Sequence, residues 1–152
     1  MRMPQICIPA VLVLFAGCTG RNLPQTFPVT GVVTHKGKPV EGAAVTLVPS
    51  GENGRSAGGE TDVDGKFSVR TYISPQDQPE GAVPGEYTIT VTKLEKRELP
   101  EGMKPEEAIR VFRDMGPPKQ LLPKNYASPN TSPLKVTIAD LAPDPLTLDL
   151  VK

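Results

Sequence analysis

Short runs of alternating positions make up most of the chain from residue 27 onward. In the first run Phe27, Val29, Gly31 and Val33 share one parity, which is the period-two pattern of a strand with one buried face. The same pattern recurs in residues 43–48, 58–61, 67–71, 87–92, 134–138 and 146–150. These runs predict an all-β chain of about seven strands arranged as a two-sheet sandwich.

The apolar parity of each later strand predicts which side chains form the core. A one-residue shift in register would turn a whole strand outward, so the prediction is specific. The residues expected to face one core between the two sheets are Val45, Leu47, Phe67, Val69, Tyr87, Ile89, Val91, Val136, Leu146 and Leu148.

Turn residues separate these runs. Gly 14 and Pro 18 are high counts that suit many short strands joined by tight turns. In the turn 62–65 we expect Gly65 to supply a positive φ and Asp62 to accept hydrogen bonds from the backbone of its own turn.

The alternation stops between residues 94 and 131, where a helix is predicted near 104–116. Pro105 suits the first helical position, the glutamates 106 and 107 favour the positive end of the helix dipole, and Gly116 ends the helix. Its apolar face consists of Ala108, Ile109, Phe112 and Met115. We expect this face to cover an open edge of the sandwich, and the alternative is a surface that binds a partner.

The N-terminus has the pattern of a secretory signal peptide. Arg2 precedes an apolar run from Ile6 to Phe15, and small residues lead to Cys18. The end of this segment resembles the lipobox of bacterial lipoproteins, which implies removal of residues 1–17 and a lipid on Cys18. The alternative is an ordinary signal peptide that leaves Cys18 as a free thiol.

The lipoprotein interpretation predicts both the segments of the chain and its location in the cell. Residues 1–17 are the expected signal peptide, 18–26 a tether and 27–152 one β-sandwich domain with its helical insertion. The chain would then be anchored to a membrane through Cys18, in the cell envelope, with the outer membrane or periplasm favoured. Losing Cys7 with the signal leaves no cysteine pair for a disulfide.

Charge excludes one class of partner. Residues 1–17 contain Arg2 and no acidic residue, so 16 of the 17 basic residues remain against 17 acidic ones. A net charge near −1 with no basic stripe argues against nucleic-acid binding.

Four turn motifs resemble a known family in their order and spacing. They are Gly31-Val32-Val33, the segment Gly37 to Leu47 (Gly-Lys-Pro-Val-Glu-Gly-Ala followed by alternation), Thr61 to Phe67 (Thr-Asp-Val-Asp-Gly-Lys-Phe), and Pro84 to Tyr87. Together they resemble the carboxypeptidase regulatory-like domains. That resemblance implies a transthyretin-like (prealbumin-like or Ig-like) sandwich with one short helix in the loop after the fifth strand. Residues 122–126 and 131–134 look like a tail common in small bacterial lipoproteins of this type.

Catalysis is not expected. The chain has the single histidine His35, whereas hydrolases of related sandwich folds use several histidines and iron dioxygenases use two. No nucleophile with a paired base is apparent. No cofactor is predicted. Glu60, Asp62 and Asp64 are the only metal candidates we weigh, as calcium ligands, against an ordinary turn.

The sequence therefore favours a non-catalytic, lipid-anchored envelope protein that presents its sandwich for adhesion, assembly or binding. Its expected partner is an envelope protein or polysaccharide. The alternative is an extracellular carbohydrate- or calcium-binding module for nutrient capture. The absence of Trp weighs against sugar binding, because sugar rings usually stack on Trp or Tyr.

Overall fold

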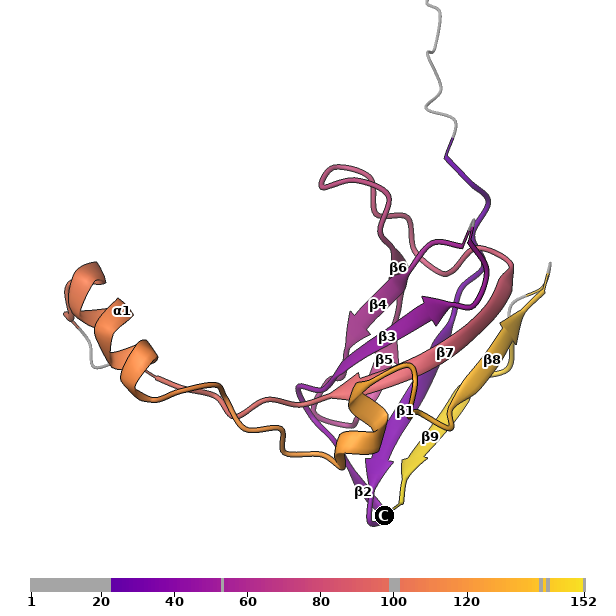
Figure 1. Ribbon diagram of the computed structural model, residues 1–152. Helices are drawn as coiled ribbons and strands as arrows, with labels where there is room; N and C mark the ends of the chain where they lie inside the picture. Colours follow the sequence, from indigo (N-terminus) through magenta and orange to yellow (C-terminus); the bar gives the residue numbers. More distant parts are fainter. Residues whose placement is uncertain (1–22, 53, 99–101, 140, 142, 152) are drawn as a thin grey trace, which may run out of the picture.

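The computed structural model describes residues 23–52, 54–98, 102–139, 141 and 143–151 (Figure 1). Within them the chain forms nine strands, one α-helix and one 3-10 helix. In chain order these are β1 (Thr30–His35), β2 (Lys38–Pro39), β3 (Ala44–Pro49), β4 (Ala57–Glu60), β5 (Lys66–Ser68), β6 (Arg70–Thr71), β7 (Gly85–Thr92), α1 (Pro105–Asp114), η1 (Lys124–Ala127), β8 (Lys135–Ile138) and β9 (Leu146–Leu150).

The strands form two sheets. In the first sheet β1 pairs in parallel with β9 along one side, and in antiparallel fashion with β5 and β2. The second sheet has the order β6-β4-β3-β7-β8, and all its pairs are antiparallel. The described residues are thus mostly β, as the alternation predicts.

The structure has nine strands where the sequence predicts about seven. One addition is β2, a two-residue strand inside a predicted turn. The other comes from the segment 66–71, which divides because β5 pairs with β1 of the first sheet and β6 with β4 of the second. Val69 lies between them: its N–H donates to the oxygen of Val29 (3.2 Å), and its oxygen accepts from the N–H of Gly81 (2.8 Å). The chain therefore passes from one sheet to the other at this residue.

The predicted core is confirmed. Of the ten residues expected there, eight are buried, while Val136 and Leu146 are partly buried and pack against the others. The predicted parity is also right around β1: Val29, directly before the strand, and Gly31 and Val33 within it are buried. A side chain at Gly31 would not fit, because its Cβ would lie 2.8 Å from the Phe67 ring and would overlap the Leu146 oxygen.

The helix is where the sequence places it, but its predicted packing is wrong. α1 covers Pro105–Asp114, with Pro105 in its first turn and Gly116 at a φ of 66° just after its end. No residue of α1 is buried, and Figure 1 shows it standing apart from both sheets at the end of an extended connection.

The tail after the helix takes the covering role instead. Leu122 and Tyr126 are buried in the core, and η1, which carries Tyr126, packs on β7. The Tyr126 hydroxyl donates to the oxygen of Val151 (2.9 Å), and the Ser132 hydroxyl donates to the oxygen of Ile89 (2.5 Å). The sandwich is closed by this tail, so α1 is not needed to cover it.

Candidate functional site

The polar groups of the turn motifs that carry the family resemblance are used for hydrogen bonds within the fold. The buried Thr61 hydroxyl donates to the oxygen of Val40 (2.6 Å) and accepts from the N–H of Ala43 (2.8 Å). The backbone adds a bond from the N–H of Gly42 to the oxygen of Thr61 (2.9 Å) and one from the N–H of Thr61 to the oxygen of Ala43 (3.0 Å). Four hydrogen bonds thus join two loops that are distant in the sequence, and the Thr61 hydroxyl has both of its roles filled inside the fold.

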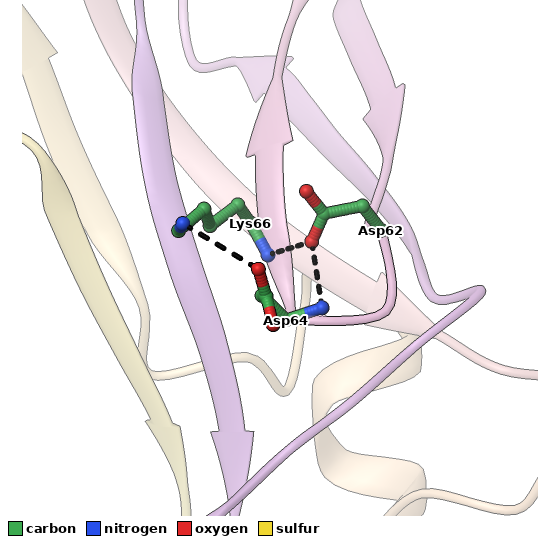
Figure 2. Close-up of polar contacts among 3 residues, drawn as sticks. All are labelled: Asp62, Asp64 and Lys66. Carbon is green, nitrogen blue, oxygen red and sulfur yellow. Dashed lines mark hydrogen bonds and ion pairs between the residues drawn. The ribbon is translucent and has the colours of Figure 1, made fainter.

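Asp62 also serves its own turn, as predicted. Its Oδ1 accepts from the N–H of Asp64 (2.9 Å) and from that of Lys66 (2.8 Å), while an Oδ2 of Asp64 lies 3.6 Å from the Lys66 ammonium (Figure 2). Gly65 has the expected positive φ, 74°. The described residues contain no group of three or more His, Cys, Asp or Glu placed to hold a metal, so Glu60, Asp62 and Asp64 are not brought together as a calcium site.

An open hollow of about 560 Å³ lies on the first sheet beside this turn. Its lining comes from β1, β5 and their neighbours and includes Gly31, Glu60, Asp62, Lys66 and Phe67. Two of the lining residues already have structural roles, because Asp62 accepts two backbone hydrogen bonds and Phe67 is buried in the core.

The other candidates for chemistry are also structural. His35 lies with Nδ1 2.7 Å from the oxygen of Leu150, and since a carbonyl can only accept, this nitrogen carries the proton. The contact ties β1 to β9. Of the three tyrosines, Tyr87 and Tyr126 are buried and only Tyr72 is exposed, so they form no aromatic platform for a sugar. Burial raises the pKa of the Tyr87 phenol above its ordinary 10.0, and the hydroxyl donates to the oxygen of Val83 (2.7 Å).

What remains is the connection that carries α1, which we call the arm and define as residues 93–98 and 102–121. Its two limbs are paired where they leave the sandwich. The N–H of Leu121 donates to the oxygen of Lys93 (2.7 Å), and the N–H of Glu95 donates to the oxygen of Lys119 (2.9 Å). The Gln120 side chain accepts from the N–H of Lys93 (3.0 Å). The arm is therefore a paired ribbon that extends β7 and holds the helix.

Arg97 fixes the end of α1 to this ribbon. Its guanidinium donates to the oxygen of Gly116 (2.5 Å) and to that of Pro117 (2.8 Å), directly after the helix ends. A cation is favourable here because the C-terminal end of a helix is negative. The Arg97 side chain is only 15% exposed, although it lies within a run of charged residues.

The arm concentrates the exposed apolar surface of the molecule. Ten large apolar side chains are exposed in the described residues, and half of them lie on the arm: Leu94, Ile109, Phe112, Met115 and Leu121. On the helix the exposed fractions are 60% for Ile109, 43% for Phe112 and 50% for Met115. A hollow of about 410 Å³ lined by Leu94, Arg97, Phe112 and Pro118 joins the helix face to the ribbon.

An apolar stripe in water on so short a helix calls for an explanation. An isolated helix of about ten residues is marginal in water and usually depends on packing of its apolar face. Here Pro105 at the start and Arg97 at the end support the helix, while no residue of its apolar face is buried within the described part of the chain. The arm is accordingly the best candidate for a functional surface.

The predicted lipidation site, Cys18, lies outside the described residues. Among those that are described, no helix is both long and apolar enough to cross a membrane.

Comparison of the chain with protein families, with curated proteins and with solved structures gave no match in any of the three.

Proposed function

We propose that this chain is a non-catalytic lipoprotein of the cell envelope, in which a transthyretin-like sandwich of the carboxypeptidase regulatory-like type holds the arm out for assembly with a protein partner. The observation that carries the proposal is the exposed apolar face of α1 on a ribbon that projects from a sandwich already closed by Leu122 and Tyr126. The two facing sheets and the helix in the connection between β7 and β8 support the family assignment, because the resemblance implies a helix at this place.

The chemistry of the helix favours a protein over a lipid surface. Helices that lie on membranes carry many Lys and Arg beside their apolar face, which anionic headgroups attract. α1 contains Glu106, Glu107 and Asp114 against Arg110 and Arg113, so it has no cationic excess. Protein interfaces combine an apolar core with a polar rim, and the apolar face of α1 with charges of both signs around it fits this arrangement.

Site-specific photo-crosslinking in intact envelopes tests the proposal. A photoreactive amino acid at position 112 is expected to form an adduct with protein. The same amino acid at position 110, on the opposite side of the helix, serves as the matched control and is expected to give far less. An adduct with lipid alone from position 112, or equal yields from the two positions, would contradict an assembly role for this face.

A further inference from the structure

Two charges border the apolar face of α1 on one side. Residues seven apart on a helix lie within about 20° of each other around its axis, so Glu106 and Arg113 flank the same side of the face, next to Ile109. Both are exposed, and neither side chain has a hydrogen bond or ion pair within the part of the chain that the structure describes. This border therefore has an acid at the start of the helix and a base at its end.

This border is complementary to the same border of a second helix that runs in the opposite direction. In an antiparallel helix pair the same border of each helix faces its counterpart, and the ends are exchanged. Glu106 of one copy then lies opposite Arg113 of the other, and the contact occurs twice because the pair has a two-fold axis. The apolar residue Ile109 lies about midway between these charges, where the two helices cross. Phe112 lies about one turn further along the same face, and Ala108 beside Ile109 is small enough to let the helices approach.

A parallel pair lacks this match. There the border that carries Glu106 and Arg113 would face the opposite border of the partner helix, which is formed by the uncharged Val111. Reciprocal Glu106–Arg113 pairs therefore form only in the antiparallel orientation.

We propose that the occupant of the α1 face is the α1 of a second copy of this chain, packed antiparallel with reciprocal Glu106–Arg113 pairs. The proposal rests on the proposed function, because it names the partner that the arm assembles with. One pair of ten-residue helices buries less than the roughly 1,200 Å² of a stable interface, so the association is weak in solution. Chains held on one membrane by their lipids meet at a much higher effective concentration, where a weak pairing is populated.

Charge reversal with mixing tests the pairing. Full-length chain purified in detergent is reconstituted in phosphatidylcholine vesicles, half of the copies labelled with a donor fluorophore and half with an acceptor. Energy transfer is then followed against the protein-to-lipid ratio. Glu106→Arg alone and Arg113→Glu alone each place like charges together twice, so we expect association about tenfold weaker for each.

The mixture of the two variants is the decisive sample. One partner then has two bases on the border and the other two acids, so association is expected to return to within about threefold of the parent chain. Each substitution weakens the interaction with the helix dipole to the same extent whether the variant is alone or in the mixture. A recovery in the mixture therefore reports on pairing between chains. Arg110→Glu, on the side away from the face, is the control and should change association less than threefold. Circular dichroism verifies that all variants are folded.

Several outcomes overturn the proposal. These are a parent chain that gives no energy transfer above a non-interacting labelled lipoprotein, reversals without effect, or a mixture no better than its components. If the parent does not pair with itself while position 112 still crosslinks to another envelope protein, the self-pairing fails and the proposed function stands. If position 112 captures no protein at all, both fail.

Discussion

Replacing Thr61 with Val removes one buried hydroxyl while keeping the shape of the side chain. That hydroxyl accepts from Ala43 at 2.8 Å and donates to Val40 at 2.6 Å, so the substitution leaves a buried N–H and a buried carbonyl without this partner. Each such group costs about 1 to 3 kcal/mol, and the carbonyl is the cheaper of the two. The new methyl group returns at most about 0.8 kcal/mol. We therefore expect a net loss of about 2 kcal/mol in the free energy of unfolding, or roughly 6 to 10 °C in Tm for a chain of this size.

Urea unfolding followed by circular dichroism measures this loss. Thr46→Val is the matched control, because Thr46 lies on β3 of the same sandwich and its hydroxyl makes no hydrogen bond within the described residues. The control is expected to change stability by no more than about 0.5 kcal/mol. If the two variants unfold within 0.5 kcal/mol of each other, roughly the scatter of a neutral substitution, the hydroxyl does not hold the two loops together and the argument is refuted.

Two further predictions concern the core and the N-terminus. Burial raises the folded-state pKa of Tyr87, so the stability from this group is present below about pH 10 and is lost as the pH rises through the folded pKa. In urea titrations the stability advantage of the parent over Tyr87→Phe should therefore shrink between about pH 8 and pH 11. A constant difference would show that the phenol is not buried in its neutral form. Mass spectrometry of the chain purified from envelopes should find an acylated Cys18 as the first residue, whereas an unmodified thiol or an intact Met1 would remove the lipid anchor from the account.

Patterns local in the sequence predicted much of this fold. Side chains alternate across a strand, so the parity of Val45, Ile89 and Leu148 identifies the core without any knowledge of the partner strands. The limits of α1 follow from Pro105 and Gly116 for a similar reason, since capping is decided within one turn. Likewise, the turn bonds of Asp62 span four residues or fewer.

The features that the sequence did not reveal depend on distant pairings. The change of sheet at Val69 is determined by pairing with β1 on one side and β4 on the other, and no pattern within residues 66–71 predicts it. Leu122 and Tyr126 belong to a segment without periodicity, so their burial, which frees α1 from covering the sandwich, could not be inferred from a pattern. Arg97 looks like any residue in a charge run until the helix end is folded back beside it. The candidate site was therefore predicted as a helix, but not as an unpartnered surface.

The double variant Ile109→Ser/Phe112→Ser tests most directly whether the arm serves assembly or the stability of the fold. Because both side chains are exposed, we expect the Tm to stay within about 2 °C of the parent chain, while crosslinking to protein in envelopes from a photoreactive amino acid at position 115, on the same face, is lost. Leu122→Ser makes the same chemical change at a buried residue and should lower the Tm by several times as much. A fall in Tm for the double variant comparable to that of Leu122→Ser, or undiminished crosslinking, would contradict the account.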